Sequence, residues 1–239
     1  MENGRGPSRL SAPHPTAIPH RPVAESIVRT SQQRSHPCLS WQSKPTRLNW
    51  SWPSVMIGLK RNIVKVVDYD PDWAMPALEG CRVVRNACGE LLVEVQHVGS
   101  TAVPELPAKP ILDIAAALAT IDSMPEIVRR LTRIGYLDRG DHGDAGGHLL
   151  VFESSPDIRT VHLHVVEHGS RQWREYLHFR DLLRQRPAIR KEYADLKRDL
   201  ASICRDDREA YTTSKADFIR EVLDNSGNWT DAYDNHGLG

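Results

Sequence analysis

QHVGSTAVPELPAKPILDI, residues 96–114, joins two apolar runs and decides how the rest of the chain is arranged. The runs at residues 91–95 and 111–118 have the length and apolar content of buried strands. Gly99, Ser100 and Thr101 form the turn after the first run, and three prolines stiffen the loop that follows. The stretch therefore predicts a strand, a small turn, a braced loop and a second strand.

This stretch carries the residue types of a phosphate site. A small, hydroxyl-bearing turn after a strand exposes backbone N–H groups, and such a concavity suits an anion. Lys109 adds a positive charge from the loop, and Asp113 stands where a carboxylate can hold a divalent cation against phosphate. The alternative is an ordinary turn followed by a capping or surface carboxylate.

The same stretch resembles the signature of the GrpB family, a bacterial branch of the nucleotidyltransferase superfamily. The resemblance implies a minimal nucleotidyltransferase-like fold, nucleotide binding and a divalent metal. It continues in the segments around residues 69–73, 162–165, 179–184, 193–197 and 211–215. The residues of this chain that match the signature are His97, Gly99, Ser100, Thr101, Val103, Pro104, Leu106, Lys109, Pro110, Asp113 and Ile114.

Two positions depart from the pattern. Glu105 stands where the family usually has glycine. The wider superfamily usually has a second carboxylate two positions after the first, and this chain has Ala115 there, two positions after Asp113. The second departure weakens the case for two-metal chemistry, because two metals need several anionic ligands.

The composition limits which classes of protein this chain can belong to. The chain has 239 residues, with 31 basic and 31 acidic side chains, but residues 1–55 carry a surplus of five positive charges and the remainder a deficit of five. A mildly acidic folded part makes nucleic acid an improbable main ligand. Four cysteines without paired spacing favour a reducing, cytoplasmic setting, and no apolar run approaches the roughly 18 residues of a membrane span.

The organisation along the chain predicts one domain with extensions. Residues 1–59 are expected to be a disordered tail or to precede the true translation start, since they are poor in aliphatic residues. Residues 60–226 are expected to form the domain, and residues 227–239 to fray. Within it, residues 63–67 predict an edge strand, a helix follows Asp70 with a break or a late start near Pro76, and residues 136–148 predict a loop.

Two histidines share one face of a predicted strand at residues 160–166. His162 and His164 lie two residues apart, whereas the opposite face is apolar. They are expected to contact phosphate or to complete a metal site with Asp113. One carboxylate and two imidazoles suit Mn or Zn as readily as Mg. The alternative is that both are structural histidines.

From residue 170 onward the pattern predicts three helices. Arg180 and Lys215 lie on mostly apolar stripes, and Tyr211 is one turn before Lys215, so both can lean toward one site. The resemblance places these three residues with the nucleotide. His97, at the end of the first strand, is either a ligand contact or a histidine that braces the turn.

We therefore expect an α+β domain in which a mixed sheet carries the loop at 97–113 and helices cover it. The leading functional hypothesis is metal-assisted transfer of a nucleotidyl group from a nucleoside triphosphate to an unknown acceptor. The alternative is a non-catalytic module that binds a nucleotide or phosphorylated metabolite, accessory to coenzyme A metabolism. The sequence leaves the acceptor, the base preference, the metal and the oligomeric state undecided.

Overall fold

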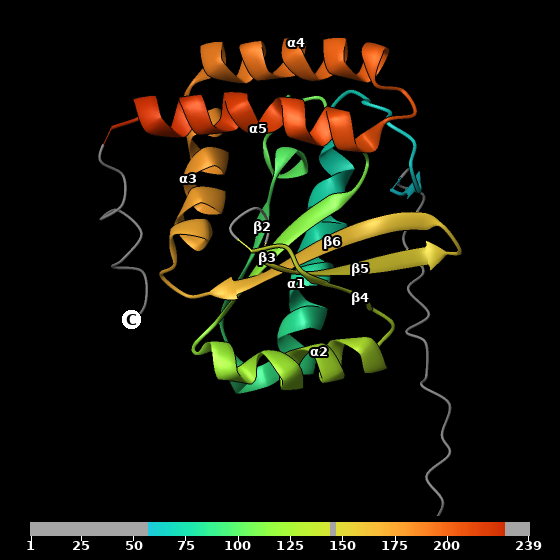
Figure 1. Cartoon of the computed structure of the whole chain (residues 1–239), viewed down its shortest axis with the longest axis vertical. Helices are drawn as coiled ribbons and strands as arrows, with labels where there is room; N and C mark the ends of the chain where they lie inside the picture. The colour runs from blue at the N-terminus through green and yellow to red at the C-terminus, as the bar shows by residue number, and fades with distance from the viewer. Residues whose placement is uncertain (1–56, 144–146, 228–239) are drawn as a thin grey trace, which may run out of the picture. The chain divides into compact units, whose positions relative to one another are not determined.

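A mixed sheet with helices on both faces organises the computed structural model, which describes residues 57–143 and 147–227 (Figure 1). Within those residues the sheet has six strands and the chain forms five α-helices. The strands are β1 Leu59–Lys60, β2 Leu92–Val98, β3 Leu112–Leu118, β4 Leu137–Asp141, β5 His148–Ser155 and β6 Ile158–Glu167. The helices are α1 Ala74–Cys88, α2 Met124–Arg133, α3 Arg171–Gln185, α4 Pro187–Ile203 and α5 Arg208–Asn225. The predicted α+β architecture is confirmed.

The sheet order brings the two chemically interesting strands together. The order is β2-β3-β6-β5-β4, with β1 paired to β6, and only the β3–β6 pair is parallel among the named strands. The register places Asp113 beside His162 and Ala115 beside His164. On the other side of β3, Val98 at the end of β2 pairs with Asp113. The predicted strand, turn and strand therefore exist, and the second strand leads Asp113 to the histidines.

Different helices cover the two sheet faces. Helices α1 and α2 pack on one face, whereas α3 packs on the other through Trp173 and Leu177, which contact Val98 and Ala115. Helices α4 and α5 lie side by side and join α3 beyond the end of the strands (Figure 1). The core under α1 and α2 includes Trp73, Val84, Cys88, Ile127, Leu131, Ile114, Ala116, Leu118, Leu163 and Val165. Asp113 lies on the α3 side, since it is two residues before Ala115.

The start of α1 matches one of the two expected arrangements, the late start of the helix. Asp70 accepts a hydrogen bond from the Asp72 amide at 2.9 Å and caps a short 3-10 turn at Pro71–Trp73. Helix α1 then begins at Ala74 and runs without a break through Pro76, its third residue. The first turn of a helix needs no bonded N–H, so proline fits there.

Two expectations about secondary structure were wrong. Residues 136–148 contain strand β4 rather than only a loop, because this edge strand is exposed on most positions and shows no apolar alternation. Residues 63–67 form no strand, and Val67 makes only a single bridge with Ala108. The Val64 amide instead donates to the Arg205 carbonyl at 3.0 Å, which ties this segment to the turn before α5.

The described residues begin just before the predicted start of the domain. Residues 57–59 fall in the predicted tail, yet the Gly58 amide donates to the Pro110 carbonyl at 2.7 Å and Leu59 pairs with Arg159. The rest of the predicted tail and nearly all of the predicted frayed end lie outside the described residues. Over the described part, no helix combines the length and apolar character that crossing a membrane requires.

Candidate functional site

The carboxylate of Asp113 packs directly against the turn after β2. Gly99 has a φ of 70°, in the left-handed region, and a Cβ placed there would lie 2.5 Å from Asp113 Oδ2. Only glycine combines that backbone conformation with so close an approach. The predicted meeting of turn and acid is therefore present, and Gly99 makes it possible.

Replacement of this glycine gives the first prediction. Gly99→Ala should destabilise the protein by about 1–3 kcal/mol more than Gly169→Ala, because only the first adds a steric clash to the backbone strain. Gly169 has the same φ of 70°, and a Cβ added to it would meet no other atom within 4 Å. Urea unfolding of both variants measures the difference, and equal losses would contradict the proposed packing.

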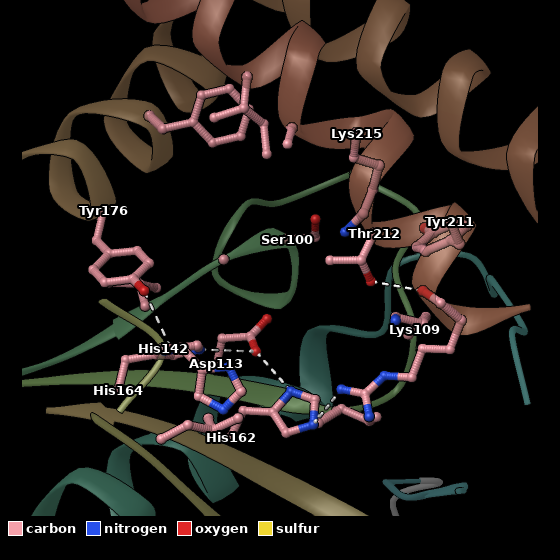
Figure 2. A pocket seen from close by; sticks show the side chains of 18 of the residues that line it. Ser100, Lys109, Asp113, His142, His162, His164, Tyr176, Tyr211, Thr212 and Lys215 are labelled. Carbon is pink, nitrogen blue, oxygen red and sulfur yellow. Dashed lines mark hydrogen bonds and ion pairs between the residues drawn. The ribbon is translucent and has the colours of Figure 1, made fainter. Parts of the chain in front are cut away.

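Asp113 and His162 form a hydrogen-bonded pair that continues to Arg208. His162 Nδ1 lies 3.2 Å from Asp113 Oδ1, and its Nε2 lies 3.4 Å from Arg208 Nη2 (Figure 2). A carboxylate only accepts and a guanidinium only donates, so the imidazole carries its proton on Nδ1 and accepts at Nε2. His162 is thus fixed in one tautomer between an acid and a base.

His164 lies beside the same carboxylate. Its Nε2 is 3.9 Å from Asp113 Oδ1, and its Nδ1 is 3.1 Å from the Tyr176 hydroxyl (Figure 2). Burial would raise the pKa of Asp113, but hydrogen bonds from His162 and His164 outweigh it and hold that pKa well below its usual range. Asp113 is therefore an anion at neutral pH.

Two lysines and a tyrosine line the side of the site opposite Tyr176. Nζ of Lys109 and Nζ of Lys215 each lie 4.8 Å from the centre of the Tyr211 ring (Figure 2). Burial, with the charges of Lys215 and Arg208, lowers the pKa of Lys109 to about 7, although Asp113 opposes the shift. Burial also lowers the pKa of Lys215. The structure thus brings together Lys109, Tyr211 and Lys215, which the sequence analysis proposed as ligand-binding residues.

A further lysine lies beneath the turn. Lys197 on α4 is 1% exposed, and its Nζ lies 3.0 Å from Ser100 Oγ and donates to the Pro107 carbonyl. Its Nζ is also 4.6 Å from the centre of the Tyr193 ring. Burial, with Lys215 and Arg198 nearby, lowers the pKa of Lys197 well below its usual value. Ser100 is therefore held from behind by a buried amine.

These side chains enclose a cavity of about 1340 Å³. Lys109, Lys197, Arg208 and Lys215 all line it, together with Asp113. Across residues 57–143 and 147–227, none of these four basic side chains forms an ion pair with a carboxylate. They contact the Ser100 hydroxyl, the Pro107 carbonyl, the His162 imidazole and the rings of Tyr193 and Tyr211. Buried cations without anionic partners carry a desolvation cost that an anionic ligand would offset.

Two predicted site residues lie outside the cavity and serve the turn instead. His97 Nε2 is 2.9 Å from Thr101 Oγ1, and burial lowers the pKa of His97 to about 4. Arg180 donates to the His97 carbonyl and to Gln96 Oε1, each at 3.1 Å, and to the Asp181 carboxylate at 2.7 and 3.0 Å. His97 thus braces the end of β2 against the turn, whereas Arg180 ties β2 to α3. The structure does not place Arg180 where it could meet a ligand. Thr101 does line the cavity, although its hydroxyl is bonded to His97.

The departure at residue 105 leaves the cavity unchanged. Glu105 adopts a φ of 64°, the left-handed conformation that glycine adopts most easily. Its side chain is 75% exposed and pairs with Arg190 at 2.6 Å. The extra charge is therefore neutralised away from Asp113.

The donor set fits a metal carried by a ligand better than a metal held by the protein. Within the described residues, no three His, Cys, Asp or Glu side chains are arranged to hold one ion. Ala115, at the position of a second carboxylate, is fully buried beneath α3 beside Trp173 and Leu177. The predicted three-ligand site of Asp113, His162 and His164 is therefore not assembled, whereas Asp113 alone can serve Mg²⁺ bound to phosphates.

Three site residues were missed by the sequence analysis. Lys197 appeared there only as part of a matching segment, and Arg208 and Tyr176 did not appear at all. Lys197 falls on the apolar stripe of α4, which is the signal that could have singled it out. Arg208 and Tyr176 carry no such signal, because their roles depend on how α5 and α3 pack against β6.

Comparisons with known proteins point to one family. A family model described as GrpB protein matches residues 63–225. The glutamate-rich protein GrpB of Alkalihalophilus pseudofirmus is 30% identical, with 70% of this chain and 98% of that protein aligned. A crystal structure of the conserved protein GrpB from Enterococcus faecalis matches with a TM-score of 0.62 and 31% identity, covering 71% of this chain and 99% of that one.

Other relatives are longer than the matching region. The UPF0157 protein YqkA of Bacillus subtilis is 31% identical over 166 residues, and the match covers 70% of this chain but only 48% of that protein. A dephospho-CoA kinase of Mycobacterium tuberculosis is 26% identical, with 73% of this chain and again 48% of the kinase aligned. The chain thus spans about half the length of these two relatives.

Proposed function

This chain belongs to the GrpB family, and on that premise we propose that its cavity binds a nucleoside triphosphate and transfers a nucleotidyl group to an acceptor. The observation that carries the proposal is the set of three cations, Lys109, Arg208 and Lys215, which line one cavity without carboxylate partners among the described residues. A ligand with several negative charges is the complement of such a set.

The size of the cavity supports a ligand larger than a single phosphate. Small-molecule sites commonly measure about 300–1,000 Å³, and this cavity measures about 1340 Å³. It therefore has room for a nucleotide and part of an acceptor. The rings of Tyr176 and Tyr211, which also line it, offer apolar surface for a base or sugar.

Each residue has a role that follows from its position. Lys109 and Lys215 would balance the charge of the phosphates from one side, and Ser100 would contact a phosphate from the turn. Asp113 would hold the divalent ion that accompanies a triphosphate, and the ion would neutralise charge on the phosphates. His162 is held by Asp113 at Nδ1 and by Arg208 at Nε2. Its Nε2 could accept a proton only after Arg208 moves away from it, toward the ligand.

A turnover assay tests the proposal. The full chain is incubated with each nucleoside triphosphate, Mg²⁺ and a cell lysate as the source of acceptor, and pyrophosphate release is followed. We expect release with at least one nucleotide, and Lys215→Met should reduce it while the exposed control Lys191→Met should not, since Lys191 pairs with Asp195 on the outer surface. A ligand that binds but is recovered intact in every case would contradict transfer.

A binding module without catalysis is the second candidate, and the burial of Ala115 favours it. With the second-carboxylate position closed by α3, the protein contributes one carboxylate rather than two to a metal. The relationship to part of a dephospho-CoA kinase also suits an accessory role near coenzyme A metabolism. Recovery of intact nucleotide or phosphorylated metabolite in the assay above would support this candidate.

A further inference from the structure

Ser100 has the surroundings of a nucleophile. It lines the cavity, and Lys197 Nζ lies 3.0 Å from its hydroxyl oxygen. A serine hydroxyl is a weak nucleophile until an adjacent base removes its proton, and a lysine can serve as that base when it is uncharged. The question is therefore whether Lys197 is a structural ammonium or an available amine.

The burial of Lys197 favours the amine. The side chain is 1% exposed, and among the described residues its polar contacts are the Ser100 hydroxyl and the Pro107 carbonyl, neither of which is an anion. A buried ammonium without a carboxylate partner is costly, and such a group loses its proton instead.

The charged groups around Lys197, taken together, lower its pKa as burial does. Lys215 on α5 and Arg198 on α4 both lower its pKa, as does burial, whereas Asp113 on β3 raises it. Tyr193, whose ring lies under Nζ, has a raised pKa because of its burial and is neutral at pH 7. Burial and the balance of these charges therefore favour the uncharged amine, whose lone pair can accept the Ser100 proton.

We propose that Ser100 and Lys197 form a nucleophile–base pair that attacks phosphorus in a phosphate ester or anhydride bound in the cavity. Ser100 Oγ forms a bond to phosphorus, and its proton passes to Lys197 Nζ. The bond from phosphorus to the leaving group breaks, and that oxygen takes the electron pair and then the proton. The product is a phosphoryl-serine ester that an acceptor hydroxyl or water attacks in a second step.

This inference rests on the proposed function in one respect, because it requires a phosphoryl compound in the cavity. It goes further in making the transfer covalent and in giving Ser100 a role in chemistry rather than in binding alone. An electrophile that contains phosphorus but no nucleotide separates the two proposals, since it reports on Ser100 whether or not a nucleotide binds.

The test uses diisopropyl fluorophosphate on the full chain, with the adduct located by mass spectrometry of peptides. Fluoride leaves in this reaction, and Ser100 should be modified faster than the exposed Ser154. Ser100→Ala should abolish the fast adduct, and Lys197→Met should slow it by about 100-fold or more. Thr212→Val, which removes a hydroxyl that lines the same cavity but is bonded to the Arg208 carbonyl at 2.8 Å, should leave the rate unchanged.

Two further measurements separate a base from a structural contact. Lys197→Arg can keep a hydrogen bond to Ser100 but cannot lose its proton, so the adduct should form as slowly as in Lys197→Met. In the wild-type protein the rate should rise with pH and level off once Lys197 is uncharged. Modification of Ser100 at the rate of Ser154, or an unchanged rate in a folded Lys197→Arg variant, would overturn the proposal. Nucleotide binding without a Ser100 adduct would overturn this inference alone, and an adduct without nucleotide binding would overturn the proposed ligand alone.

Discussion

Asp113→Asn is expected to destabilise the protein by about 2–4 kcal/mol at pH 7. A hydrogen bond to a charged group, like the one from His162 to Asp113, is worth about 1.5–3 kcal/mol, and loss of the charge also removes the attraction to the nearby cations. Solvent screening limits the second effect because 32% of the Asp113 side chain is exposed. The variant keeps an oxygen that can accept from His162 but leaves Lys109, Lys215 and Arg208 without the acid that raises the pKa of each.

The direction of the pKa shift of Asp113 determines how the effect of the substitution depends on pH. The folded-state pKa of Asp113 lies below its usual value, so its contribution is present at pH values above the ordinary pKa of about 4 and is lost as the pH falls. Urea unfolding of wild type and variant should therefore differ most near neutral pH and converge below pH 4. Asp217→Asn is the matched control, because Asp217 is 79% exposed and pairs only with Arg220 at the surface of α5.

The same substitution should affect ligands in opposite ways. Without divalent metal, Asp113→Asn should bind pyrophosphate more tightly, because a negative charge has left the cavity. With Mg²⁺ present, nucleotide binding should lose its dependence on the metal if Asp113 holds the ion. Unchanged titrations under both conditions would mean that Asp113 does not face the ligand.

The ligand-free protein is expected to become more stable as the pH rises from 7 to 9. Lys109 has a pKa of about 7 in the folded protein, and Lys197 and Lys215 are shifted in the same direction. Over this range the unfolded chain binds more protons than the folded one, so the free energy of unfolding increases with pH. The full shift of Lys109 corresponds to a few kcal/mol, at about 1.4 kcal/mol per pKa unit.

The expected gain in stability diminishes at high pH, and two changes should reduce it. Above pH 9 the buried thiols of Cys81 and Cys88, with pKa values raised to about 11, act in the opposite direction, so the gain should become smaller there. Lys109→Met should flatten the rise of stability with pH, because it removes a lysine that loses its proton. Pyrophosphate should flatten it too, because a bound anion restores the charge of the lysines. Urea midpoints measured at pH 7, 8 and 9 provide the comparison. A stability that falls over this range, equally in wild type and Lys109→Met, would contradict the assigned environment.

The sequence predicted the parts of the fold that depend on local pattern. The apolar runs at 91–95 and 111–118 became β2 and β3, and the Pro187 break separates α3 from α4. Apolar runs of this length give a clear signal in the sequence, because they occur where strands contribute to the core. Strand β4 was missed because an edge strand exposed on most positions has no such signal, and its pairing comes from β5.

The candidate site was predicted less completely, for a physical reason. Gly99, Ser100 and Asp113 lie within one short stretch, so the sequence shows them together. His162 and His164 could be placed on one face, but their common neighbour Asp113 depends on the β3–β6 register. Arg180 was misplaced because an arginine on an apolar stripe can equally bind backbone carbonyls, as it does at His97. The position of Arg208 follows only from the packing of α5.

Calorimetric titration of the full chain with ATP and Mg²⁺ tests the central claim, that uncompensated cations in the cavity bind a polyphosphate. We predict one site per chain, weaker binding as salt is added, an affinity lowered about tenfold or more in Lys215→Met, and no change in Lys191→Met. If neither ATP nor pyrophosphate gives saturable heat at millimolar concentration, or if both lysine variants behave alike, the cavity does not recognise phosphate and the proposed function is wrong.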